Sequence, residues 1–177
     1  MGNTLLNDDA IGIIVVRYLQ SRLENFCDID FKETSWGGFR IIDLLRGYDY
    51  CIILDSIKTG QSNIGFIHHL KTSDLLPTLR LNSYHDINFI TALKLAETLN
   101  EKMPEDIDIF AVEVIDTLTI TENLTAAVSD SIFECSKKVV ETLIDKNLLD
   151  NKFELPKEDK IISEEDLRQL YSEKDVA

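Results

Sequence analysis

The sequence predicts a three-layer α/β fold, in which helices cover both faces of a twisted, mostly parallel central sheet. The run at 50–55 is continuously apolar until Asp55, the pattern of a strand that is buried on both faces, and residues 106–114 are expected to form another buried strand. Amphipathic helical patterns alternate with these runs along the chain, which is typical of βαβ units. The chain has 177 residues, 44% of them apolar, and we expect residues 1–149 to form one compact domain.

Three longer helices are expected. Residues 8–23 carry apolar side chains at every third or fourth position, as a helix with one buried face does. Asp8 or Asn7 can cap the first turn of this helix. A second helix is expected to begin at Asp86, and a third, over residues 124–149, closes the domain.

The remaining elements are short. Residues 27–34 are compatible with a strand, and 39–47 with a short helix that ends at a glycine. The run at 50–55 is expected to be a central parallel strand and 64–70 an edge strand. A helical turn is expected at 72–77, where a proline stops it.

The last part of the chain has a different composition. Residues 150–177 are dense in charge and poor in large apolar side chains, so we expect a charged C-terminal tail that is solvated rather than packed. Within it, Ser163 and Asp166 have the spacing that can start a short helix.

Charge and hydropathy exclude several classes of partner. The chain has 18 Lys and Arg against 32 Asp and Glu, a formal net charge of -14, which disfavours nucleic acid and anionic membrane surfaces. The longest apolar stretch, at 11–16, is far shorter than the roughly 20 residues of a membrane span. No charged-then-apolar signal segment opens the chain, so we expect a cytoplasmic protein.

The cysteines give no sign of a redox or metal site. They are three in number and have no CxxC spacing, which argues against a disulfide framework and a structural zinc site. We expect reduced, mostly buried thiols at Cys27, Cys51 and Cys135.

Candidate chemistry gathers where strands end, because ligands of open α/β sheets bind beyond the carboxyl ends of the strands. Asp55 ends the most apolar strand, although a carboxylate there can also simply accept hydrogen bonds from a helix start. Of Asp8 and Asp9, one can cap the following helix, which leaves the other free to point into the same crevice as Asp55. His85 can reach that crevice from a loop, and Asp86 is either an outer partner or a helix cap. Two carboxylates and one imidazole can hold a divalent transition metal with positions left open.

Other motifs favour structural roles. His68 and His69 are adjacent on a predicted strand, so they face opposite sides and cannot easily grip one ion; exposed edge positions are expected. Trp36 and the two glycines after it form either a tight turn, which we favour, or a flexible wall for an extended peptide. The GxSxG and HExxH motifs are absent and no cysteine is in an evident nucleophile context, which disfavours a serine or cysteine hydrolase. The GxGxxG fingerprint of dinucleotide binding is absent too.

Several segments in order resemble one family, the hydrogenase maturation endopeptidases. The resemblance covers about residues 2–144 and rests mainly on three segments, GNTLLNDDAIG at 2–12, CIILDSI at 51–57 and NSYHDINFITAL at 82–93. Relatives carry an apolar strand immediately before the Gly-Asn pair, whereas only Met1 precedes that pair here. We therefore expect the first strand to be missing, either because the true chain starts upstream and Met1 is an internal methionine or because the sequence is a fragment.

The resemblance implies an endopeptidase that removes a C-terminal extension from the precursor of a nickel-iron hydrogenase large subunit, after nickel has been delivered. The metal-binding residues of the family carry over to Asp9, Asp55 and His85, with Asp9 standing where relatives often have Glu. They would contact nickel supplied by the precursor rather than a permanently held ion. The ion could polarise the scissile carbonyl or activate water, or a carboxylate could act as general base.

Two further interpretations belong to other classes of protein. One is a noncatalytic metal- or nucleotide-binding module on a Rossmann-like sheet, and the other is an inactive interaction protein that has kept the fold. For the endopeptidase, the expected partner is the large-subunit precursor, and a monomer is expected.

Overall fold

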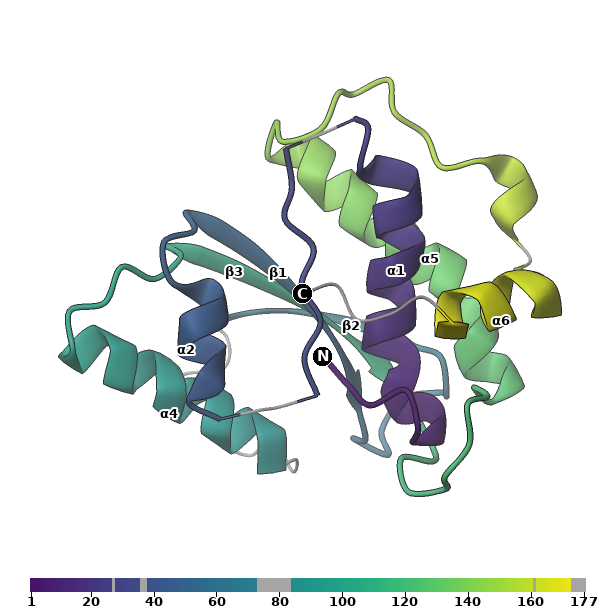
Figure 1. Ribbon diagram of the computed structural model, residues 1–177, viewed down its shortest axis with the longest axis horizontal. Coiled ribbons are helices and arrows are strands. Elements are labelled where there is room, and N and C mark those ends of the chain that lie inside the picture. Colours follow the sequence, from purple (N-terminus) through teal and green to yellow (C-terminus); the bar gives the residue numbers. More distant parts are fainter. Residues whose placement is uncertain (27, 36–37, 73–83, 161, 173–177) are drawn as a thin grey trace.

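The computed structural model describes residues 1–26, 28–35, 38–72, 84–160 and 162–172. Within them a three-stranded sheet lies between two layers of helices (Figure 1). β1 (Tyr50–Ile57) pairs in parallel with β3 (Asp106–Glu113), and β2 (Ile67–Lys71) pairs antiparallel with the other edge of β3. The predicted three-layer α/β fold is confirmed, although the described sheet is mixed rather than mostly parallel.

The order of the strands, β1-β3-β2, corrects one expectation. The run at 50–55 was predicted to be central, but β3 is the central strand and β1 is an edge strand of the described sheet. Helices cover both faces of β1, which explains the apolar run at 51–54 that precedes Asp55 and Ser56 near the end of the strand. Burial of both faces does not reveal whether a strand has neighbours on both edges. The edge position predicted for 64–70 is confirmed by β2.

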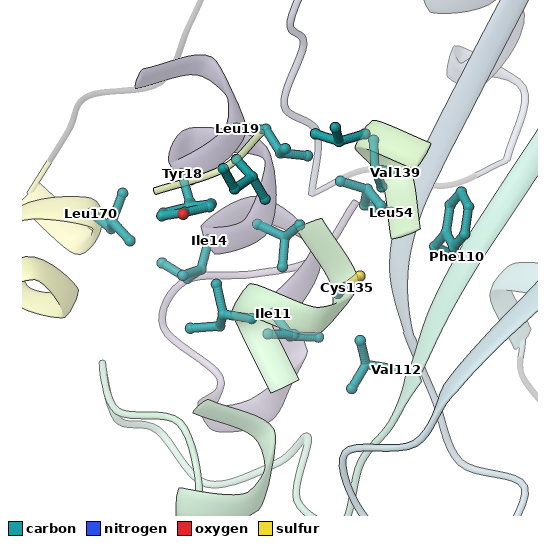
Figure 2. Close-up of a cluster of buried hydrophobic side chains, with 14 of the residues drawn as sticks. Ile11, Ile14, Tyr18, Leu19, Leu54, Phe110, Val112, Cys135, Val139 and Leu170 are labelled. Atoms are coloured by element: carbon teal, nitrogen blue, oxygen red, sulfur yellow. The ribbon is translucent and has the colours of Figure 1, made fainter. Parts of the chain in front are cut away.

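One face of the sheet carries the larger core. α1 (Ile11–Leu23), α5 (Ala126–Asp145) and α6 (Glu164–Ser172) lie on this side (Figure 1). Figure 2 shows how side chains of the three helices meet those of the sheet in one apolar cluster. The residues labelled there are Ile11, Ile14, Tyr18, Leu19, Leu54, Phe110, Val112, Cys135, Val139 and Leu170.

The opposite face is covered by α2 (Arg40–Leu45) and α4 (Tyr84–Thr98). A second, smaller cluster lies there, in which Ile53 and Ile107 of the sheet pack against Ile41 and Phe89. The described part of 27–34 forms no strand, contrary to the expectation. Apart from Thr72, the turn predicted at 72–77 lies outside the described residues, as do Trp36 and Gly37.

The start of α1 differs from the prediction. Residues 7–10 form a 3-10 turn, η1 (Asn7–Ala10), and Ala10 precedes α1 without any side-chain cap. The prediction that Asp8 or Asn7 caps this helix is therefore wrong. The Asp8 carboxylate is buried and points instead toward the segment after β3, with which it forms the hydrogen bonds described below.

The charged C-terminal stretch packs against the domain rather than lying in solvent. Leu155 and Leu170 are buried in the larger core, and the Arg17 side chain donates to the backbone carbonyl of Leu170 at 2.8 Å. Ser163 and Asp166 exchange hydrogen bonds at the start of α6, which confirms the predicted helix start. The expectation of a solvated tail is wrong for these residues, while the division of the chain after residue 149 stays a prediction.

The close approach of α1 to β1 depends on Gly12. A Cβ atom at this position would overlap the backbone carbonyls of Met1 and Leu54. We expect Gly12→Ala to lower the free energy of unfolding by about 3 kcal/mol, because backbone on both sides cannot move as a side chain can. Urea unfolding measures this, with Gln20→Ala on the same helix as the control. A loss no larger than that of the control would contradict the packing.

Among the described residues, no helix combines the length and the apolarity that a membrane span requires.

Candidate functional site

Asp9 and Asp55, two of the three predicted site residues, are brought together through Ser56. The Ser56 hydroxyl donates to Asp9 Oδ1 at 3.0 Å, and its backbone N–H donates to Asp55 Oδ1 at 2.9 Å. Asp9 lies in η1 and Asp55 near the end of β1, and both are partly exposed. Residues 46 positions apart in sequence thus lie close together near the carboxyl end of a parallel strand, beyond which ligands of such sheets bind.

The two carboxylates act on the same neighbouring group. The α-amine of Met1 is buried beside them and donates to the backbone carbonyl of Leu54. Burial lowers the pKa of this amine, while the charges of Asp55 and Asp9 act in the opposite direction and favour its charged form. The pair therefore contributes a negative potential at this position, although burial is the larger effect on the amine.

His85, the third predicted residue, lies in the first turn of α4, which begins at Tyr84. The expectations that His85 lies on a loop and that the helix begins with Asp86 as its cap are therefore wrong, because the helix starts two residues earlier. Side chains at 84–88 are not among those that the structure describes, so the approach of His85 to the carboxylates stays a prediction, as does the role of Asp86. The register of β1 places Asp55 on the same face as Ile53, and α4 covers that face. Among the side chains that are described, no three His, Cys, Asp or Glu residues gather as a metal cluster.

Asp8 fixes the segment that carries Asp9. Its Oδ1 accepts a hydrogen bond from the backbone N–H of Thr125 at 2.7 Å, and its Oδ2 accepts one from that of Asp116 at 3.2 Å. The Thr125 hydroxyl adds a bond at 3.2 Å. A buried carboxylate thus joins η1 to the segment between β3 and α5 and holds the neighbouring Asp9 in place.

A second polar cluster, which the sequence did not suggest, lies at the end of β3. The buried Glu113 accepts hydrogen bonds from the backbone N–H groups of Thr59 and Gly60, each at 2.8 Å, and from the Thr59 hydroxyl at 2.6 Å. His68 Nε2 lies 2.9 Å from Glu113 Oε2. This carboxylate fixes the connection after β1. The sequence did not indicate this burial, because a charged residue near the end of a buried strand is equally compatible with an exposed position.

The adjacent histidines of β2 face opposite sides, as predicted. His68 contacts Glu113, whereas His69 lies 2.5 Å from the buried Asp108 carboxylate and stacks on the ring of Phe110. The exposed position expected for both is right for His69, at 41% side-chain exposure, and wrong for His68, at 18%. Both histidines pair with buried acids, which explains their positions without a metal.

Glu113→Gln is expected to destabilise the fold at neutral pH and less so in acid. Burial alone would raise the pKa of Glu113, but the hydrogen bonds from Thr59, Gly60 and His68 outweigh it and hold the pKa below its ordinary value of 4.5. Such a carboxyl stabilises the fold above its unfolded-state pKa and loses that contribution as the pH falls through its folded-state pKa.

Urea unfolding of Glu113→Gln and the unsubstituted chain, at about pH 7 and about pH 3.5, measures this difference. The loss of unfolding free energy should be larger at the higher pH. Equal losses at both values would show that the charge of Glu113 does not contribute.

The cysteines behave as predicted where they are described. Cys51 and Cys135 are free thiols. Burial raises the pKa of Cys51 to about 11 and that of Cys135 to about 12, so neither is poised as a nucleophile. Cys27 lies outside the described residues.

The structure is that of an α/β protein in which two carboxylates, Asp9 and Asp55, lie near the carboxyl end of a parallel strand. A family model described as hydrogenase maturation protease matches residues 13–144. The chain therefore belongs to the hydrogenase maturation protease family, and its enzyme class is that of endopeptidases. The family predicted from the sequence is confirmed. No curated protein matches the chain.

Solved structures of the same kind share the fold. The maturating endopeptidase HybD from Escherichia coli is 23% identical, with a TM-score of 0.67 over 82% of this chain and 89% of that one. An E. coli endopeptidase solved in solution is 22% identical, with a TM-score of 0.69 over 84% and 91%. HybD from Thermococcus kodakarensis, a [NiFe] hydrogenase maturation protease, is 20% identical, with a TM-score of 0.61 over 80% and 93%.

Proposed function

We propose that this protein cleaves the C-terminal extension from the nickel-loaded precursor of a nickel-iron hydrogenase large subunit. Membership of the maturation protease family supports the reaction class and the kind of substrate. The observation that carries the assignment of the site is the Asp9–Asp55 pair joined by Ser56. Two carboxylates held close to one serine suit a divalent cation, and His85 would supply the borderline nitrogen ligand that nickel accepts.

In this proposal nickel belongs to the substrate. The precursor carries the ion to Asp9, Asp55 and His85, so that the protease acts only on a precursor already loaded with metal. Ser56 keeps Asp9 oriented by its hydroxyl and Asp55 by its backbone N–H. The bound ion can polarise the scissile carbonyl or activate a water molecule, and either effect lowers the activation free energy by several kcal/mol. Alternatively, one carboxylate acts as general base while the metal positions the substrate.

The partner in this account is the large-subunit precursor. The cytoplasmic location and the monomeric state expected from the sequence stay predictions, and size-exclusion chromatography with light scattering tests the second.

The proposal is tested by incubating the protein with nickel-loaded precursor and measuring the intact mass of the large subunit. We expect loss of a single C-terminal peptide, and His85→Ala is expected to abolish this loss without lowering the unfolding midpoint. Thermal stabilisation by nickel without any shortening would instead favour a noncatalytic metal-binding module.

A further inference from the structure

Four apolar side chains are exposed close to the candidate site. Leu5 is 54% exposed, Ile115 59%, Leu118 82% and Ile120 82%. We call these four residues the apolar patch. Single exposed apolar side chains are ordinary, but a group of them on two adjoining segments is typical of an interaction surface.

The two segments are joined by backbone hydrogen bonds. The N–H of Thr121 donates to the carbonyl of Leu5 at 3.0 Å, and the N–H of Asn7 donates to the carbonyl of Thr121 at 3.1 Å. The N–H of Asp8 donates to the carbonyl of Asp116 at 3.0 Å. In Figure 1 the connection from β3 to α5 accordingly passes beside the start of α1. The apolar patch is thereby continuous with the segment that carries Asp9.

The segment that displays Leu118 and Ile120 is held in shape. Asp116 Oδ1 accepts hydrogen bonds from the backbone N–H groups of Leu118 and Thr119, both at 3.0 Å, and these bonds lower the pKa of Asp116 to about 2. From the inner side, Asp8 accepts hydrogen bonds from the N–H groups of Asp116 and Thr125. The apolar side chains are therefore presented by a preorganised loop, which lowers the entropy cost of binding.

Charge indicates the kind of partner. The ionised Asp116 lies between Ile115 and Leu118, and the exposed Glu122 lies two residues after Ile120, on a chain whose net charge is -14. Lys58 is a nearby base, close enough to act on Asp116. A second copy of this chain would bring the same acidic surface and be repelled. A partner segment with apolar side chains flanked by Lys or Arg is complementary in both respects.

We propose that the apolar patch docks a basic, apolar segment of the hydrogenase large-subunit precursor. This rests on the proposed function, which already brings the precursor to Asp9 and Asp55. Recognition would then have two parts, because the patch binds the polypeptide whether or not nickel is present, while the carboxylates respond to the metal.

The test uses nickel-free precursor as the probe, since the proposed function leaves it uncleaved. Its affinity is measured for the unsubstituted chain and for the double variant Leu118→Asn with Ile120→Asn. We expect binding about tenfold weaker in the double variant, as loss of two anchoring side chains implies. Leu99→Asn is the matched control, because Leu99 is an exposed leucine beyond the end of α4 opposite to His85, and should bind as the unsubstituted chain does.

A pair of charged variants tests the electrostatic part. Leu118→Glu with Ile120→Glu should bind the precursor more tightly than Leu118→Lys with Ile120→Lys, because the docked segment is basic. All variants should keep the unfolding midpoint, since both positions are 82% exposed.

The outcomes separate this proposal from the proposed function. Patch-dependent binding supports docking even if nickel-loaded precursor is never shortened, a result that would overturn the proposed function alone. Unchanged affinity in the double variant overturns docking, as does the opposite order of the Glu and Lys variants. A dimer that dissociates in the double variant would show that a second copy covers the patch and would also overturn it.

Discussion

Asp55→Asn is expected to leave nickel-loaded precursor at full length while the protein stays folded. The amide keeps the size of the side chain and an oxygen that can accept the hydrogen bond from the Ser56 N–H, but it removes the negative charge beside Asp9. Loss of the several kcal/mol that a metal-polarised transition state supplies lowers kcat/KM on the order of a thousandfold. The measurement is the initial rate of precursor shortening, followed by intact mass.

Asp43→Asn is the matched control for this variant. Asp43 is on α2, its side chain is 74% exposed, and its ion pair with Arg46 is long at 3.5 Å. The Asp43→Asn variant should process the precursor at the same rate as the unsubstituted chain. Full activity of Asp55→Asn, with the same unfolding midpoint, would remove Asp55 from the site.

Arg17→Met is expected to have the largest effect on stability. The Arg17 guanidinium pairs with both oxygens of Glu33 at 2.7 Å, and the two side chains are only 3% and 2% exposed. It also donates to the backbone carbonyls of Leu170 and Tyr171, at 2.8 and 3.3 Å. Removal of one partner leaves a buried, uncompensated carboxylate, which costs about 3–5 kcal/mol. Urea unfolding measures the loss.

A double variant separates the charge from the packing. Arg17→Met combined with Glu33→Gln removes both charges, and we expect it to recover part of the unfolding free energy lost in the single variant. The part not recovered reports the bonds that tie α1 to α6. A loss below about 1 kcal/mol in Arg17→Met, the range of a surface ion pair, would contradict the buried geometry.

The elements that local sequence periodicity defines were predicted well. The period of apolar residues at 8–23 and 124–149 marks α1 and α5, and the apolar runs mark β1 and β3. The carboxyl ends of the strands correctly indicated where polar groups gather. Ser56, which joins the site residues, has only its position next to Asp55 as a signal.

The features that were missed depend on contacts between distant residues. Leu155 and Leu170 stand among charges, and their burial follows from partners on α1 that lie far away in sequence. The edge position of β1 depends on which strands pair, which the burial of its faces does not encode. Asp8 has the ordinary position of a helix cap, yet it is used for a long-range bond to Thr125.

We propose that Asp9 and Asp55, with His85, bind the nickel of the precursor and so select the loaded form. It is tested most directly by the intact mass of the large subunit after incubation with nickel-loaded and with nickel-free precursor, at equal concentrations. We expect only the nickel-loaded precursor to be shortened. The nickel-free sample should be shortened once nickel has been added to it. Equal shortening of both samples would contradict nickel recognition, and no shortening of either would contradict the proposed reaction.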